Sequence, residues 1–252
     1  MYRTEYWVEA RRPDGGVLGA GFYVTRRFVM TADHCLRPLA ESESDVVLVH
    51  ADGTEAPGVV CERREDVDLA LIRLVGRSFV RPPVPQVCKK NDRWRTPNRP
   101  SPSDPHLNGA VDEPNVKYDC VSGTQLEALQ LSTEVVLGNY EGYSGSAVER
   151  VGEEATLAGV LQEQYQNRFD EKLGATNVLW AVTMREAFAA FADYFDDHAP
   201  ADPATDVRRH TSALEQLADW EAHGLVGPSA VNTIQLEIAR AMVEQFLSKG
   251  SA

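Results

Sequence analysis

Three polar residues of this 252-residue chain could together perform nucleophilic catalysis. Ser144 lies in the stretch GYSGSAV, His34 in TADHC and Asp68 in DVDLALI. A serine hydroxyl is a poor nucleophile until a base takes its proton, and a histidine base needs an acidic group that orients its ring. These residue types therefore suit acyl transfer, with Ser144 as nucleophile, His34 as base and Asp68 as the orienting acid.

Each of the three residues also has an ordinary structural interpretation when it is taken alone. Glycine and serine are common in turns, because glycine adopts positive φ values freely and a short hydroxyl side chain bonds its own backbone. A single histidine is usually a core or surface residue, and Asp68 stands where a turn leads into an apolar strand. The order of the three segments, with apolar strands between them, is what favours catalysis.

Short apolar runs predict the strands that would position these residues. Residues 6–31 and 46–64 hold β-rich runs separated by turns, and DLALIRLV is a continuous apolar run typical of a strand buried on both faces. The segment from about Pro82 to Pro114 is rich in proline, asparagine, serine and charge, so we expect a connection and a loop there. Strand patterns return with VKYDCVSG and continue to NVLWAVT, and REAFAAFADYF has helical spacing.

Four segments in this order resemble those of the chymotrypsin-like (trypsin-fold) serine proteases. GAGFYV, FVMTADHC, DVDLALIRL and GYSGSAV match the family's successive motifs, and the likeness runs from about residue 8 to residue 183. The resemblance implies a mainly β fold of two Greek-key barrels with the active site between them. It also implies a catalytic triad of His34, Asp68 and Ser144, with an oxyanion hole formed by the backbone N–H groups of Gly142 and Ser144.

The resemblance also sets the expected domains. We expect an N-terminal barrel over 1–83, which holds the histidine and the aspartate, and an interdomain connection and loop over 84–114. A C-terminal barrel with the serine and a closing helix should cover 115–197, and a linker with a helical hairpin should cover 198–252. The short spacing between the histidine and the aspartate resembles compact bacterial, HtrA-like members, and we expect no PDZ domain after the catalytic unit.

Two departures from the secreted members of this family bear on activation. In those proteins the cysteine beside the catalytic histidine often forms a disulfide with a cysteine about sixteen residues upstream. Here Cys35 is present, but the upstream position is Gly19, so no such disulfide can form. The secreted members also carry an aspartate just before the serine, which pairs with a new N-terminus after zymogen cleavage. Tyr143 occupies that position here, so activation by N-terminal cleavage is not expected.

Two further departures lie close to the histidine and the aspartate. Asp33 stands where the family usually has alanine; it either tunes the histidine or faces solvent, and we favour solvent. In the strand after the serine, a serine often supports the catalytic aspartate. Leu161 and Gln162 fall near that position, so this support for Asp68 is in doubt.

Charge and cysteine content reduce the classes of partner and cofactor that the sequence allows. The net charge of −13 and pI of about 4.9 disfavour nucleic acid and anionic membranes as partners, since both attract Lys and Arg. The chain has no apolar run long enough to span a bilayer and no signal-peptide pattern, so we expect a cytoplasmic protein without a propeptide. No metal or organic cofactor is implied. Four free cysteines without a CxxC pair are expected, namely Cys35, Cys61, Cys88 and Cys120.

The predicted function is a serine endopeptidase that cleaves protein or peptide substrates. The alternative is a trypsin-fold binding or adaptor module with a silent site. An α/β-hydrolase is disfavoured, because its G-x-S-x-G motif would need glycine where Ser146 stands. The C-terminal helices predicted at 207–223 and 229–248 either complete the second barrel or bind a regulatory protein partner. Regulation by a partner or by oligomerisation, as in bacterial conflict or antiviral systems, is a hypothesis that follows from the expected lack of a propeptide.

Overall fold

The computed structural model describes residues 5–40, 42–76, 78, 80, 82–119, 124–135, 137, 139–152, 155–166 and 175–192. The chain divides into two compact units, Met1–Ala190 and Phe191–Ala252. The predicted linker and helical hairpin of 198–252 lie outside the described residues. The first unit contains all the residues of the candidate site.

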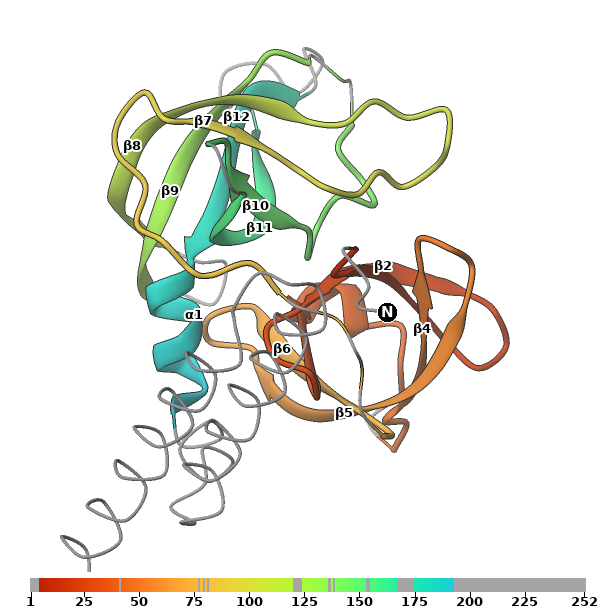
Figure 1. Ribbon diagram of the computed structural model, residues 1–252. Coiled ribbons are helices and arrows are strands. Elements are labelled where there is room, and N and C mark those ends of the chain that lie inside the picture. The colour runs from red at the N-terminus through yellow and green to blue at the C-terminus, as the bar shows by residue number, and fades with distance from the viewer. Residues whose placement is uncertain are drawn as a thin grey trace, which may run out of the picture. The chain divides into compact units, whose positions relative to one another are not determined.

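The first barrel is a closed antiparallel sheet of six strands, drawn in red to orange in Figure 1. Its strands are β1 (Trp7–Arg11), β2 (Val17–Tyr23), β3 (Phe28–Ala32), β4 (Asp45–His50), β5 (Glu55–Arg64) and β6 (Leu69–Leu74). Around the barrel they follow the order β1-β2-β3-β6-β5-β4, so β6 pairs with both β3 and β5. Every residue of β3 and all but one of β6 are buried, as the continuous apolar runs predict.

The second barrel is also closed, with the order β10-β11-β12-β9-β8-β7. Its strands are β7 (Arg93–Arg95), β8 (Asn108–Asp119), β9 (Gln125–Thr133), β10 (Ala147–Arg150), β11 (Thr156–Gln166) and β12 (Ala175–Thr183). A buried cluster that includes Trp94, Leu131 and Leu179 fills its interior. Two such barrels confirm the predicted mainly β, trypsin-like architecture.

The segment 84–114 differs from its predicted role as connection and loop. It contains β7 and the first half of β8, so strands of the second barrel begin at Arg93 rather than after residue 114. Pro114 lies inside β8, where the register with β9 shifts between Glu113 and Val116. A bulge leaves residues without ladder partners, and it can therefore hold a proline that has no N–H to donate.

The pairing of β3 with β6 brings the predicted base and acid together. The two strands are antiparallel, with Ala32 opposite Leu69, so the residues that follow β3 meet those that precede β6. The short 3-10 helix η1 (Asp33–Leu36) follows β3 at once. This arrangement places His34 beside Asp68, although 34 positions separate them in the sequence.

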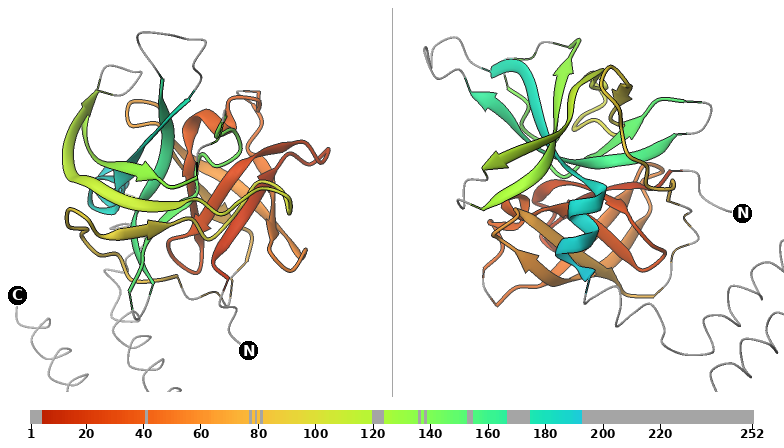
Figure 2. Two further views of the ribbon diagram at one scale, coloured as in Figure 1. Left: turned by 90° about the horizontal axis from the view of Figure 1, so that it is seen from above. Right: turned by 90° about the vertical axis from the view of Figure 1, so that its left-hand side faces the viewer.

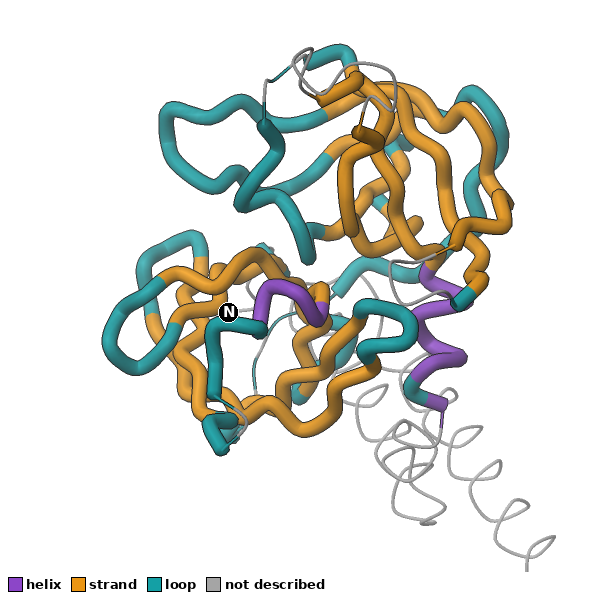
Figure 3. The backbone as a smooth tube through the Cα atoms, turned by 180° about the vertical axis from the view of Figure 1, so that it is seen from behind, coloured by secondary structure: helices purple, strands orange, loops and turns teal. Residues whose placement is uncertain are grey.

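Helix is confined to two short elements of the described chain, η1 and α1 (Met184–Ala190), as Figure 3 shows. α1 follows β12 directly and confirms the described part of the helix predicted from REAFAAFADYF. The Arg64 guanidinium of the first barrel donates to the Ala190 carbonyl at 2.8 Å, and the right-hand view of Figure 2 shows α1 reaching that barrel. Neither element, within the described residues, has the length and apolar character needed to traverse a bilayer.

Candidate active site

His34 and Asp68 form a double hydrogen bond. The ring Nδ1–H of His34 donates to Oδ2 of Asp68 at 2.7 Å, and the backbone N–H of His34 donates to Oδ1 at 2.8 Å. Both side chains are partly buried, with 29% of His34 and 20% of Asp68 exposed. A proton held on Nδ1 by the carboxylate leaves Nε2 free to accept another, which is the tautomer that a general base requires.

The backbone of Asp68 is held in the left-handed region, with φ of 51°. Aspartate tolerates this conformation better than most residues, but it still costs free energy unless the surroundings fix it. The Asp68 carbonyl accepts from the Asp33 N–H at 3.0 Å, and its carboxylate is held by His34. The Asp68 N–H also donates to the Glu65 carbonyl at 3.3 Å, so backbone bonds hold this residue on both sides while its carboxylate orients the histidine.

The turn that carries Ser144 is seated on the first barrel. The Ser144 carbonyl accepts from the Ala20 N–H of β2 at 3.2 Å and from the Cys35 thiol at 3.5 Å. A Cβ on Gly145 would lie 2.2 Å from the Ala20 oxygen and 2.5 Å from the Thr31 hydroxyl, so only glycine fits there. The glycine after the serine therefore allows the turn of the second barrel to approach β2 and the residues next to His34.

The hydroxyl of Ser144 forms a hydrogen bond with β11. Its Oγ donates to the Gln162 carbonyl at 2.9 Å, and within the described part of the chain no hydrogen bond joins it to His34. Rotation about the Cα–Cβ bond moves such a hydroxyl between staggered positions without any backbone shift. In the bond that catalysis needs between nucleophile and base, this hydroxyl would donate to Nε2 of His34 instead of to the Gln162 carbonyl.

Gln162 and Leu161 do not supply the support for Asp68 that the sequence left in doubt. Gln162 is only 3% exposed, and neither atom of its amide has a partner among the described residues. Leu161 packs in the core of the second barrel. Among the residues that the structure describes, only His34 donates to the Asp68 carboxylate.

The backbone N–H groups of Gly142 and Ser144 are available to a ligand. In the described structure neither donates to a protein acceptor, whereas the N–H groups of Tyr143, Gly145 and Ser146 all do. Gly142 has φ of 86°, a conformation that favours glycine. Two unpaired N–H groups beside a serine are the donors that an oxyanion hole uses.

Asp33 is buried and paired, so the expectation that it faces solvent is wrong. The Arg63 guanidinium binds its carboxylate in a bidentate manner, with Nε–Oδ1 at 2.6 Å and Nη2–Oδ2 at 3.1 Å. The register explains this contact, because Ala70 of β6 lies opposite both Thr31 and Arg63. The sequence signal for this pair is the aspartate at position 33, where the family usually has alanine, but this signal does not name the partner.

The variant Arg63→Met should destabilise the protein by about 3 kcal/mol, because it leaves the Asp33 carboxylate buried without a counter-charge. Arg63 is 31% exposed, and water can reach that side of the pair, so we expect the lower end of the range for buried pairs. Urea unfolding followed by tryptophan fluorescence measures the loss. In the double variant Asp33→Ala with Arg63→Met, most of the stability should return. A single variant within about 0.5 kcal/mol of the wild type would contradict this interpretation.

The surroundings of His34 favour its protonated form. The hydrogen bond with Asp68 is the largest cause, the neighbouring Cys35 thiol is the second, and together they raise the pKa of His34 above 6.5 although burial opposes them. Cys35 and Cys88 are buried thiols, and the Cys61 thiol donates to the Leu71 carbonyl at 3.2 Å. Cys120 lies outside the described residues.

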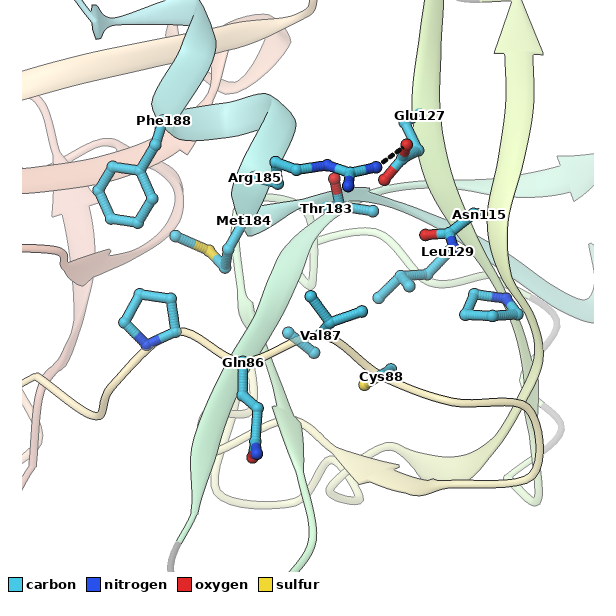
Figure 4. A pocket seen from close by; sticks show the side chains of 13 residues that line it. Gln86, Val87, Cys88, Asn115, Glu127, Leu129, Thr183, Met184, Arg185 and Phe188 are labelled. Carbon is cyan, nitrogen blue, oxygen red and sulfur yellow. Dashed lines mark hydrogen bonds and ion pairs between the residues drawn. The ribbon is translucent and has the colours of Figure 1, made fainter.

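A separate cavity of about 140 Å³ lies between β9, α1 and the segment that precedes β7 (Figure 4). Val87, Leu129, Met184 and Phe188 give it an apolar lining, and an ion pair between Arg185 and Glu127 lies at its edge. Its one thiol is Cys88, and burial raises the pKa of this group to about 11. None of the predicted catalytic residues lines this cavity.

Comparison with known proteins finds a peptidase family and protease structures that this chain resembles. A family model of the trypsin-like peptidase domain matches residues 19–149. Comparison with curated proteins gives no match. The inactive form of the Rv3671c protease of M. tuberculosis is similar with a TM-score of 0.56 and 16% identity, over 75% of this chain and 88% of that one. Its active form gives 0.55 and 17%, over 75% and 79%.

The HtrA-type protease AlgW, determined with a decapeptide, is also similar. Its TM-score is 0.58 and its identity 11%, over 76% of this chain and 64% of that one. At these identities the likeness to solved structures is one of fold. The matched span of residues 19–149 contains His34, Asp68 and Ser144, so the family match and the candidate site coincide.

Proposed function

Because this chain belongs to the trypsin-like peptidase family, we propose that it is a serine endopeptidase whose catalytic residues are Ser144, His34 and Asp68. The observation that carries the proposal is the double hydrogen bond between His34 and Asp68, with Nδ1 and Oδ2 at 2.7 Å. It fixes the imidazole so that Nε2 is the basic nitrogen. The seating of the serine turn on β2 supports the same assignment.

In the proposed mechanism, Nε2 of His34 takes the proton of Ser144 while Oγ attacks the carbonyl carbon of the scissile peptide. The carbonyl oxygen becomes an oxyanion, which accepts from the N–H groups of Gly142 and Ser144. The imidazolium, stabilised by Asp68, then gives its proton to the leaving amine, and the C–N bond breaks to leave an acyl-enzyme. Water repeats the sequence and releases the acid, so Ser144 and His34 return to their starting states.

The proposed mechanism predicts that the acidic limb of the pH–rate profile lies above the ordinary histidine pKa of 6.5. Only the neutral imidazole of His34 can accept the serine proton, and Asp68 raises the pKa of that imidazole. The rate should therefore fall as the pH drops through the raised pKa. Labelling of Ser144 by a fluorophosphonate, followed from about pH 5 to about pH 10, measures the midpoint. A midpoint at or below 6.5 would contradict the prediction.

Cleavage of denatured proteins tests the endopeptidase assignment. The purified protein is incubated with a mixture of unfolded polypeptides, and new termini are mapped by mass spectrometry. We expect new termini inside the substrate chains, and we expect pretreatment with a fluorophosphonate to prevent them. Sites trimmed only from chain ends, or no new termini at all, would contradict an endopeptidase.

A silent binding module is the second candidate, and the resting position of the serine hydroxyl favours it. Oγ of Ser144 donates to the Gln162 carbonyl instead of to His34. A protein that never rotates this hydroxyl would keep the fold without the activity. Fluorophosphonate labelling separates the two candidates, because the reagent needs an activated serine.

The proposed function includes how the protease is regulated and where in the cell it acts. We propose cytoplasmic activity on protein or peptide substrates, restrained by a protein partner or by oligomerisation, as in a bacterial conflict system. Residues 198–252, which lie outside the described part, are the segment proposed to bind that partner. Deletion of residues 204–252 should then change activity or oligomeric state. A truncated protein that is unchanged in both would overturn this part.

A further inference from the structure

Tyr143 links the serine turn to a loop of the second barrel. Its side chain is 2% exposed and packs in the core with Trp94 and Val148. Its hydroxyl donates to the Pro105 carbonyl at 2.5 Å, across 38 positions of sequence. A buried tyrosine hydroxyl needs a partner, and here that partner belongs to the loop between β7 and β8.

The loop between β7 and β8, residues 96–107, is itself closed by hydrogen bonds at its base. The Thr96 N–H donates to the Leu107 carbonyl at 2.8 Å, and the Leu107 N–H donates to the Thr96 hydroxyl at 3.2 Å. The same hydroxyl donates to the Asn98 carbonyl at 3.1 Å. The loop therefore offers the serine turn a fixed support.

A second contact from this loop reaches the turn at Gly142. A Cβ placed on Gly142 would lie 2.8 Å from Cβ and 2.9 Å from Cγ of Pro100, so the proline ring packs directly against this residue. Glycine has no strong preference among backbone conformations, so its φ of 86° must be selected by its neighbours. Pro100 packs against Gly142, and the next residue in the chain, Tyr143, is anchored to the same loop by its hydroxyl.

Tyr143 also orders the hydrogen bonds of the turn. Its N–H donates to the Tyr140 carbonyl at 3.2 Å, and its carbonyl accepts from the Ser146 N–H at 3.1 Å. With these bonds made, the N–H groups of Gly142 and Ser144 on either side of Tyr143 have no acceptor in the described structure. A rotation of the Tyr143 backbone would change the direction of the Ser144 N–H relative to that of the Gly142 N–H.

We propose that Tyr143 is a positioning residue of the oxyanion hole, anchored by its hydroxyl to the loop 96–107, whose Pro100 fixes Gly142. The inference rests on the proposed function, because it concerns donors that act only on a developing oxyanion. No cleavage of the chain is needed to set the turn, because the support comes from a loop already in place. The loop 96–107 thereby becomes part of the catalytic apparatus without touching the reacting atoms.

The test compares Tyr143→Phe with the wild type on a peptide drawn from the mapped cleavage sites. The variant loses only the hydroxyl, so the turn keeps its packing but loses its anchor. We expect kcat to fall about 30-fold, less than the loss from removing an oxyanion donor outright, with KM within about twofold. Affinity for a peptide boronic acid, whose tetrahedral adduct places an oxygen in the hole, should fall by the same factor.

Matched variants separate positioning from folding. Tyr23→Phe removes another buried tyrosine hydroxyl, which bonds His50 in the first barrel at 2.9 Å, and should leave kcat unchanged. Pro100→Gly removes the contact with Gly142 and should lower kcat as Tyr143→Phe does. Pro102→Gly, at an exposed position of the same loop, should not.

Three outcomes decide the matter. Lower kcat and boronate affinity in both Tyr143→Phe and Pro100→Gly, with both control variants unaffected, would support the inference. If the wild type is active and these two variants keep kcat within about twofold, or lose kcat with boronate affinity unchanged, the inference is wrong. A wild type that neither cleaves peptides nor reacts with a fluorophosphonate would instead overturn the proposed function, and the inference with it.

Discussion

Ser144→Ala should lower kcat/KM for peptide hydrolysis by about 10⁶, the largest effect expected of any substitution in this chain. The variant removes the atom that attacks the substrate and leaves the oxyanion donors and the substrate contacts in place. Water that attacks the substrate in the remaining site should give a residual rate, and the rate of the variant cannot fall below it. Initial rates on a peptide from the mapped cleavage sites, with enzyme in large excess for the variant, measure the loss.

His34→Ala should lower kcat/KM by the same factor. The double variant of Ser144→Ala with His34→Ala should have the same kcat/KM as either single variant. Residues that act as one unit in a single step are not additive, because removing either disables the step. The fold should survive Ser144→Ala, since the lost hydroxyl donates only one hydrogen bond, to the Gln162 carbonyl. A Ser144→Ala protein that keeps more than about one hundredth of the activity would mean that another group is the nucleophile.

Asp68→Asn should lower kcat by about 10⁴ while the fold is kept. An asparagine amide can donate to Nδ1 of His34 and so hold the ring in the wrong tautomer, and it cannot stabilise the imidazolium. Asparagine tolerates the left-handed backbone at this position, where φ is 51°, so the substitution is a conservative one for the structure.

The pH profile of Asp68→Asn provides an independent check. The hydrogen bond with Asp68 is the main cause of the raised pKa of His34, so the acidic limb should move to lower pH in the variant. Thermal unfolding of both proteins controls for a loss of structure. If kcat of the variant falls by less than about tenfold, or if the acidic limb of its pH–rate profile lies at the same pH as in the wild type, Asp68 is excluded as the partner of the base.

The sequence was sufficient to predict the parts of the site that depend on local patterns. Apolar runs directly before His34 and directly after Asp68 indicate two buried strands, and β3 and β6 are those strands. The motif around Ser144 places glycines where the turn needs them, as the close approach of Gly145 to the Ala20 oxygen shows. These features follow from residues adjacent in the chain.

The start of the second barrel was not predicted, because β7 is very short and a proline interrupts β8. β7 has only three residues, and β8 contains a proline at a bulge. A pattern of alternation cannot be recognised over three residues, and Pro114 breaks the pattern in a strand that the neighbouring β9 nevertheless completes.

Two contacts near the site depend on the path of the chain, and the local sequence does not name the partner in either of them. Arg63 pairs with Asp33 across 30 positions, and Tyr143 bonds Pro105 across 38. Each residue shows in the sequence as a departure from the family's usual one, at Asp33 and at Tyr143. The partner becomes apparent only when the barrel register and the loop 96–107 are known.

The most direct test of the proposed protease is the reaction of the folded protein with a fluorophosphonate, followed by mass spectrometry of its peptides. We predict a single adduct on Ser144 that forms in the wild type, is absent from Ser144→Ala and is strongly reduced in His34→Ala. An adduct at another serine, or no adduct in the folded wild type, would contradict a catalytic triad of Ser144, His34 and Asp68.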